Sequence, residues 1–257
     1  PVTNTYNVLP DEFADTCKEM VKYGAKVLGG CCGTTPAYVA KLKEMVATVN
    51  ASVVKKKPRQ LAVCTPLKTV VVDQPRIVGE RINPTGKKRF KQALRDNDMN
   101  YILSQAIEQI DAGADILDVN VGSPDIDEKE MMVKVIKALQ AIVDVPLQID
   151  STKPEVLEAA LRVYNGKPIV NSVNGEEEVL DTILPIVAKY GGAVIGLALD
   201  ENGIPPTAEG RVEIAKRIRD KAMSYGIPKE DIIIDCLTLT VSAEQKAAAE
   251  TLKAMNI

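Results

Sequence analysis

The sequence contains no histidine and no tryptophan. Imidazole is the most frequent general base in enzymes and a common metal ligand, so its absence excludes Ser-His and Cys-His catalysis and histidine-bound metals within this chain. Any proton transfer must use Asp, Glu, Lys, Tyr, Cys or water. The chemistry of the chain is therefore to be sought among carboxylates, amides and thiols.

Long apolar runs and a strong net charge are also missing. The longest apolar stretches have the length of a strand and fall far short of a membrane span. A formal net charge of -3 gives no reason to expect capture of nucleic acid or of an anionic membrane. Residues 1–20 lack a basic start followed by an apolar core, so they do not read as a signal peptide. We expect neither a nucleic-acid partner nor a membrane partner.

The cysteines are few and odd in number. There are five of them, and two are adjacent in the sequence. This pattern does not indicate a disulfide framework and fits a reducing compartment, so we expect the chain to be cytoplasmic. The cysteines are Cys17, Cys31, Cys32, Cys64 and Cys236.

The first 75 residues divide into a structured segment and a linker. Residues 11–25 have one apolar face and predict a helix, residues 26–28 predict a short buried strand, and Pro36 opens a second helix that runs to about Val49. Residues 51–75 lose this periodicity and contain three consecutive lysines followed by Pro58. We predict domains at 1–50 and 76–257, joined by a linker over 51–75.

From residue 76 onward, short apolar segments alternate with amphipathic ones. Such repeated strand–helix units predict a parallel sheet. The predicted strands are 77–80, 116–120, 147–150, 169–171, 193–199 and 232–236. The predicted helices lie near 98–112, 128–143, 154–164, 176–190 and 208–225, and a last one starts near Ser242.

The polar residues distinguish a barrel from a doubly wound sheet. Almost every predicted strand ends in Asp, Asn or Glu, and barrel enzymes draw their site residues from many strand ends. A doubly wound sheet concentrates ligand groups at one switch point, and no Gly-x-Gly-x-x-Gly follows any strand here. A complete barrel has eight units in ~250 residues. We therefore expect an α/β (β/α)8 TIM-type barrel, truncated to about six units and incomplete at its C-terminal side.

The polar strand ends form one set of hydrogen-bond acceptors. Each residue taken alone is best explained as a helix cap or a loop contact. Together they predict a binding site at the barrel mouth, because buried carboxylates are costly without partners and few basic residues lie nearby. A pterin ring supplies the N–H donors that such a site requires, since one carboxylate can accept two of them side by side. The set comprises Glu80, Asn83, Asp118, Asn120, Asp150, Asn171, Asn174 and Asp235.

These strand ends resemble the motif series of the pterin-binding methyltransferase barrels. The matching segments are Gly79-Glu80-Arg81-Ile82-Asn83, Leu117-Asp118-Val119-Asn120-Val121-Gly122, Asp150-Ser151-Thr152, Asn171-Ser172-Val173-Asn174 and Ile234-Asp235. The resemblance implies that Asp150, Asn171 and Asp235 hold the pterin, with Asn120 beside them. It also implies catalytic roles for Asp150 and Asn171.

A second resemblance concerns the N-terminal segment. Leu28-Gly29-Gly30-Cys31-Cys32-Gly33-Thr34-Thr35-Pro36 is similar to the last strand–helix turn of homocysteine methyltransferase barrels. There, two adjacent thiolates and a third upstream cysteine bind the zinc that activates the homocysteine thiol. The resemblance implies that residues 1–50 are the C-terminal end of such a barrel and that Cys31 and Cys32 are metal ligands. Because the third ligand is not in this chain, we expect little or no zinc binding.

Taken together, the two resemblances imply the cobalamin-dependent methionine synthase family. In that family the N5 methyl of methyltetrahydrofolate passes to a cob(I)alamin corrinoid carried by other domains, and then to homocysteine. Three alternatives stay open at this point. They are a methyltransferase that serves a separate corrinoid protein, a folate-binding fragment without activity, and a dihydropteroate synthase.

Overall fold

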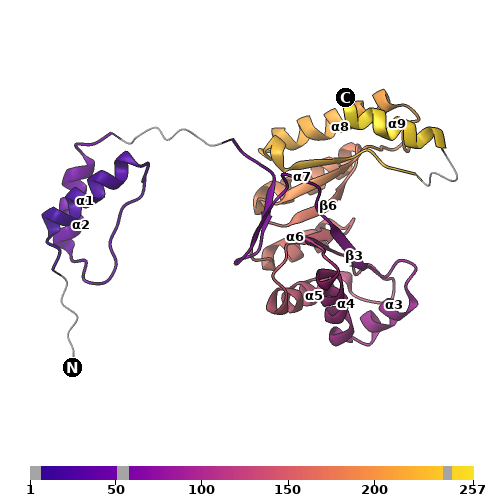
Figure 1. Cartoon of the computed structure of the whole chain (residues 1–257), viewed down its shortest axis with the longest axis horizontal. Helices are drawn as coiled ribbons and strands as arrows, with labels where there is room; N and C mark the ends of the chain where they lie inside the picture. Colours follow the sequence, from indigo (N-terminus) through magenta and orange to yellow (C-terminus); the bar gives the residue numbers. More distant parts are fainter. Residues whose placement is uncertain (1–6, 51–57, 240–244) are drawn as a thin grey trace. The chain divides into compact units, whose positions relative to one another are not determined.

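The chain forms two compact units, Pro1–Pro58 and Arg59–Ile257. The computed structural model describes residues 7–50, 58–239 and 245–257. Figure 1 shows the course of the chain through both units. We describe each unit by itself.

The first unit is a pair of packed helices. Helix α1 (Pro10–Lys22) and helix α2 (Pro36–Val46) each begin with proline, which suits the first turn because the missing N–H has no partner there. They pack through Cys17 of α1 and Leu42 of α2. The strand predicted over 26–28 is not formed, and Val27 is 92% exposed. A strand needs a neighbouring strand for its backbone hydrogen bonds, and the described part of this unit contains none.

The second unit is built on a six-stranded parallel sheet with the order β3-β4-β5-β6-β7-β8. The strands are β3 (Val78–Ile82), β4 (Ile116–Val119), β5 (Leu147–Asp150), β6 (Ile169–Val173), β7 (Ala193–Leu197) and β8 (Ile232–Asp235). Each strand pairs in parallel with the next one in the sequence, which is the winding of a TIM-type fold. This confirms the predicted fold class. Within the described residues the sheet does not close, and β3 and β8 form its edges.

Helices connect the strands and cover the outer face of the curved sheet (Figure 1). They are α3 (Lys88–Arg95), α4 (Met99–Asp111), α5 (Glu128–Ile142), α6 (Pro154–Val163), α7 (Glu177–Tyr190), α8 (Ala208–Ser224) and α9 (Gln245–Asn256), with a short 3-10 helix at Lys229–Asp231. Helix α3 was not predicted, although Phe90 and Leu94 give it a buried face. No helix in the described ranges is both long and apolar enough to cross a bilayer.

The two faces of the sheet pack against different partners. Leu117, Leu147 and Ile149 belong to the large core beneath the helices. Side chains at the alternate positions of the strands point to the opposite, inner face. Among them, Ile116 and Ile169 join a separate apolar cluster. Alternation along each strand therefore separates a helix-facing set of side chains from an inward-facing set.

A short antiparallel hairpin covers the inner face where the strands begin. It consists of β1 (Ala62–Cys64) and β2 (Thr69–Val71). Val63 and Val70 pack on the first residues of β4, β6 and β7. Cys64 and Lys167 exchange two backbone hydrogen bonds of 3.0 Å, which anchor the hairpin to the segment before β6.

The hairpin also corrects the extent of the predicted linker. Residues 59–75 belong to the second unit, because the valines of the hairpin are buried against the starts of the strands. Burial of apolar surface is reason enough for this segment to fold onto the sheet. Residues 51–57 of the predicted linker lie outside the described residues.

We predict that Val63→Ala destabilises the second unit by about 2 kcal/mol, because it removes both γ-methyl groups of a side chain that is 0% exposed. Leu67→Ala, on the turn of the same hairpin and 86% exposed, should change stability by less than about 0.5 kcal/mol. Urea unfolding curves of the two variants measure the difference. Equal effects would show that the hairpin is not part of the cooperative core.

Candidate functional site

The carboxyl ends of β4, β5 and β6 bring together a network of acid and amide side chains. Asp118 of β4 lies opposite Gln148 of β5 in the strand register, and its side chain is 1% exposed. Its Oδ1 accepts a hydrogen bond from Gln148 Nε2 at 2.6 Å and another from Asn171 Nδ2 at 3.2 Å. Three neighbouring strands therefore meet at one carboxylate oxygen.

A second pair lies one step nearer the strand ends. Asn120 Nδ2 donates to Asp150 Oδ2 at 2.8 Å, and the backbone N–H of Gly122 donates to Asn120 Oδ1 at 2.8 Å. Asp150 in turn stands opposite Asn171 in the register of β5 and β6. The structure thus brings Asp118, Asn120, Asp150 and Asn171 into one cluster, as alternation on the strands predicts.

One atom of this cluster has no partner. Asp118 Oδ2 is buried, and no donor within the described residues reaches it. An unsatisfied buried acceptor costs roughly 1–3 kcal/mol, and more when it is charged, so folded proteins rarely keep one without a purpose. A ligand with an N–H group placed there would supply the missing hydrogen bond.

The environment of Asp118 favours its protonated form. Burial is the main cause and raises the pKa of Asp118 to about 6. The hydrogen bond from Gln148 works against this rise, while the negative charge of Asp150 adds to it. Near neutral pH this carboxyl group can therefore both hold and release a proton.

The pKa of Asp150 is raised in the same direction. Burial is again the largest cause, the hydrogen bond from Asn120 opposes it, and the charges of Glu80 and Glu128 add to it. Four acidic groups therefore act on one small region. The cluster has a surplus of acceptors and of negative charge, so a complementary ligand must bring donors.

Glu80 and Asn83, near the end of β3, are hydrogen-bonded to each other. Glu80 is exposed at the edge of the sheet, and its Oε1 accepts a hydrogen bond from Asn83 Nδ2 at 2.9 Å. Asn83 is buried, and its Oδ1 accepts from the backbone N–H of Thr85 at 2.9 Å. This pair borders the cluster, since the charge of Glu80 acts on both Asp118 and Asp150.

The two remaining predicted residues make local turn contacts. Asn174 Nδ2 donates to Glu176 Oε1 at 2.8 Å, and Asn174 Oδ1 accepts from the backbone N–H of Glu176 at 3.0 Å, at the start of α7. Asp235 is exposed at the end of β8, where its Oδ1 accepts from the backbone N–H of Leu237 at 2.8 Å. Neither residue contacts the cluster directly within the described part of the chain. Their assignment to the site stays a prediction.

Two members of the site were missed from the sequence. Gln148 was detectable, because it precedes Asp150 by two residues and so faces the same side of an otherwise apolar strand. Glu128 gave no such signal. It lies 23 residues before Ser151, and only the folded chain places its carboxylate 2.6 Å from that hydroxyl.

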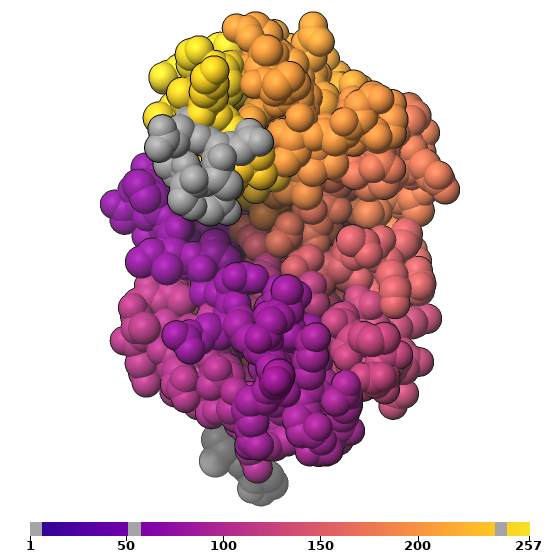
Figure 2. Space-filling model, turned by 90° about the vertical axis from the view of Figure 1, so that its right-hand side faces the viewer, coloured from indigo at the N-terminus to yellow at the C-terminus, as the bar shows by residue number. Residues whose placement is uncertain are grey.

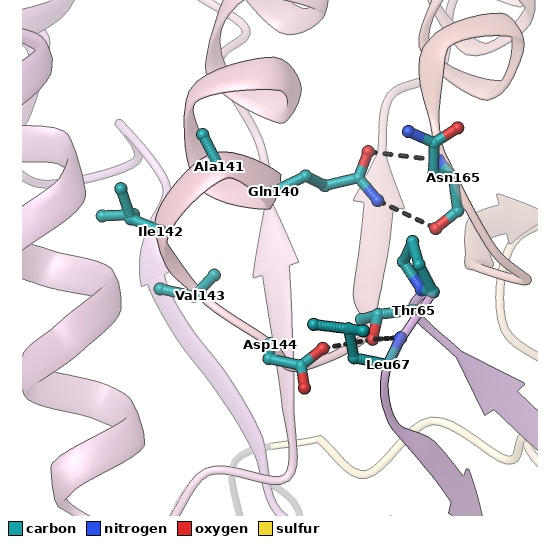
Figure 3. Close-up of a pocket in the computed structure, with 9 residues that line it drawn as sticks. Thr65, Leu67, Gln140, Ala141, Ile142, Val143, Asp144 and Asn165 are labelled. Carbon is teal, nitrogen blue, oxygen red and sulfur yellow. Dashed lines mark hydrogen bonds between the residues drawn. The ribbon is translucent and has the colours of Figure 1, made fainter. Parts of the chain in front are cut away.

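A cavity of about 390 Å³ lies at the other end of the strands (Figure 3). Asp144 and Thr65, which are hydrogen-bonded to each other, lie on its wall just before β5 and in the hairpin turn. Gln140 and Asn165 form two further hydrogen bonds of 3.0 and 3.1 Å. None of the predicted site residues lines this cavity, and the side chains of Gln140, Asp144 and Thr65 on its wall are already hydrogen-bonded. It therefore provides no argument for the site.

The adjacent thiols predicted as metal ligands lie in the first unit. Cys31 and Cys32 are exposed between α1 and α2, with their Sγ atoms 3.7 Å apart, and Cys17 is buried on α1. No three His, Cys, Asp or Glu side chains among the described residues are placed to hold a metal ion. A zinc ion that activates a substrate is held by three protein ligands, so the two thiols supply two of the three.

Figure 2 shows one face of the second unit, on which segments from the start, middle and end of that unit reach the surface. The parallel β/α sheet and the acceptor cluster at its carboxyl ends define a TIM-type protein with a site suited to a donor-rich ring. Residues 79–256 match the pterin binding enzyme family, and the chain belongs to this family. Residues 2–46 match a second family, homocysteine S-methyltransferase.

Two curated relatives match most of this chain. The chain is 32% identical over 255 residues to a methionine synthase of Mycobacterium leprae (strain TN), covering 94% of this chain and 21% of that protein. It is 33% identical over 250 residues to a methionine synthase of Mycobacterium tuberculosis (strain ATCC 25618 / H37Rv), with the same two coverages. The chain thus spans about a fifth of the length of these relatives.

Solved structures with the same fold include dihydropteroate synthases. That of Xanthomonas albilineans, in complex with indole-2-carboxylic acid and 6-chloroguanine, is 20% identical with a TM-score of 0.58 and covers 77% of this chain and 72% of its own. That of Yersinia pestis with a pterine-sulfa conjugate is 17% identical with a TM-score of 0.57, covering 76% and 71%. At these identities the likeness establishes the fold alone.

The raised pKa of Asp118 predicts a measurable loss of stability with rising pH. The folded state holds this proton more tightly than the unfolded chain, so the stabilisation is full below the ordinary carboxyl pKa and is lost as the pH rises through about 6. In Asp118→Asn, the difference in unfolding free energy between about pH 4.5 and about pH 7.5 should shift by about 2 kcal/mol in favour of the higher pH. Asp111→Asn, an exposed change at the end of α4, is the control and should follow the parent chain.

Proposed function

We propose that this chain binds 5-methyltetrahydrofolate at the carboxyl ends of β4, β5 and β6 and supports transfer of its N5 methyl group to a cob(I)alamin corrinoid. The observation that carries the proposal is the buried, unpartnered Oδ2 of Asp118 beside the acceptors Asp150 and Asn171. The 2-amino-4-oxopyrimidine edge of a pterin presents N–H donors in a row. It therefore complements a cluster that has more acceptors than donors.

The chemistry requires a proton as well as a binding site. The N5 nitrogen is a poor leaving group when it loses its methyl, so it must gain a proton or a strong hydrogen bond in the transition state. Asn171 can donate a hydrogen bond but cannot act as an acid at neutral pH. The proton would come from water, or through a network that includes a carboxylate such as Asp118, to which Asn171 is hydrogen-bonded.

The acceptor of the methyl group would come from elsewhere. A cob(I)alamin corrinoid, held by a corrinoid-binding domain, would supply the nucleophile that accepts the methyl group. We assign no corrinoid ligand to the described residues. In methionine synthesis, homocysteine would then receive the methyl group from the corrinoid. The zinc that activates the homocysteine thiol would use Cys31 and Cys32 as two of its ligands.

Two findings support this proposal over a dihydropteroate synthase. The match to homocysteine S-methyltransferase precedes the pterin-binding segment in the same chain, and methionine synthases are similar to this chain over 94% of its length.

Two other functions remain to be separated by assay. A methyltransferase that serves a separate corrinoid protein would demethylate 5-methyltetrahydrofolate only when that protein is added. A folate-binding fragment without activity would bind the ligand and transfer nothing to free cob(I)alamin. Binding and methyl transfer should therefore be measured separately on the same preparation.

We predict that Asp150→Asn weakens 5-methyltetrahydrofolate binding by roughly ten- to a hundredfold, the loss expected for charge-assisted hydrogen bonds. Isothermal titration of the full chain measures the affinity. Asp111→Asn removes the same charge from an exposed site and should leave the affinity unchanged. If the parent chain binds but Asp150→Asn binds equally well, Asp150 does not hold the pterin.

We predict that the first unit binds little or no zinc. Because Cys31 and Cys32 offer two sulfur ligands, a chromophoric zinc chelator should keep its metal when the reduced chain is added in excess. Cys31→Ser and the parent chain should behave alike in this competition. Stoichiometric removal of zinc from the chelator by the parent chain alone would contradict the prediction.

A further inference from the structure

Glu128 is a nearly buried acid that the mechanism above does not use. It is the first residue of α5, and its side chain is 9% exposed. Its Oε1 accepts a hydrogen bond from Ser151 Oγ at 2.6 Å, and its Oε2 lies 2.9 Å from Lys153 Nζ. Both oxygens are therefore directed at the turn that follows Asp150, the central acid of the candidate site.

The contacts of Glu128 continue into the site. Ser151 is buried, and its backbone N–H donates to the carbonyl oxygen of Asn171 at 3.1 Å. Its hydroxyl also accepts from the backbone N–H of Lys153 at 3.2 Å. Glu128 thus fixes a serine that links the end of β5 to the end of β6, the two strands that carry Asp150 and Asn171.

Glu128 also lies against the turn after β4. A β-carbon added to Gly122 would be 3.8 Å from Cδ of Glu128. The N–H of that same glycine donates to Asn120, which itself donates to Asp150. A single side chain of α5 therefore holds the turn after β5 through Ser151 and lies beside the turn after β4.

Charge provides a second link between Glu128 and Asp150. The groups that face Asp150 from the surrounding elements are Glu80 of β3, Asp118 of β4 and Glu128 of α5, all acidic, while Asn171 of β6 is neutral. Lys153 offsets Glu128 from the solvent side. Loss of the charge on Glu128 would remove one negative charge from the surroundings of Asp150. It would also leave Lys153 without its ion-pair partner Glu128.

We propose that Glu128 is a positioning residue of this site, which holds the turn after β5 through Ser151 and sets the charge that surrounds Asp150. This inference rests on the proposed function for its role in binding, but its physical part concerns the chain alone. The simpler explanation is that an acid in the first turn of α5 stabilises the helix dipole. Glu130, exposed in the same turn, would serve that purpose equally well and is the matched control.

The first experiment follows the titration of Asp150 by carboxyl carbon NMR in the full chain without ligand. Glu128→Gln keeps the shape of the side chain and removes its charge, so the pKa of Asp150 should fall, because a negative neighbour no longer opposes its ionisation. Glu130→Gln should leave that pKa in place. An unchanged or higher pKa of Asp150 in Glu128→Gln overturns the electrostatic part of the inference, whether or not a folate binds.

The second experiment measures 5-methyltetrahydrofolate affinity by titration calorimetry. Ser151→Ala and Glu128→Ala each remove the hydrogen bond that holds the turn, and each should weaken binding roughly three- to tenfold, while Glu130→Ala stays within about twofold. Parental affinity in both variants overturns the positioning role. No binding by the parent chain refutes the proposed function instead, and the NMR titration then decides the inference about Glu128 independently.

Discussion

The cost of burying carboxylate oxygens is the constraint on which this site depends. Asp118 is 1% exposed, yet only one of its two oxygens finds donors within the described residues. The protein meets part of the cost with amides, since Gln148 and Asn171 donate to that oxygen and Asn120 donates to Asp150. The other oxygen of Asp118 keeps no donor within the described residues, and a ligand rich in N–H groups could supply one.

The two faces of the sheet have different roles in keeping these buried acid and amide side chains in place. The outer face packs against the helices in one large core. The inner face is apolar where the strands begin, and the β1–β2 hairpin covers it there. Toward the carboxyl ends the same inner face becomes polar. The hairpin and helices supply the burial that stabilises the sheet, so the few polar residues at the mouth are free to serve binding rather than folding.

The sheet topology accounts for the convergence of polar side chains from several strands. The parallel order β3-β4-β5-β6-β7-β8 places all strand ends on one edge, within the segment that matches the pterin binding enzyme family. The segment upstream adds a match to homocysteine S-methyltransferase. Support for methyl transfer, as distinct from pterin binding, comes from this pairing and from the methionine synthase relatives rather than from the site alone.

The sequence by itself determined the features that depend on local periodicity. Short apolar segments between amphipathic ones predicted the six strands. Alternation with a period of two placed Asp118 and Asn120 on one face, because successive side chains of a strand point to opposite sides. Tertiary structure decided what depends on contacts between distant segments. Residues 59–75 became part of the second unit through contact with residues beyond 115, and residues 26–28 formed no strand because no neighbouring strand is present in the described part of their unit. Glu128 joined the site only when folding brought it to Ser151, since no local pattern records a contact across 23 residues.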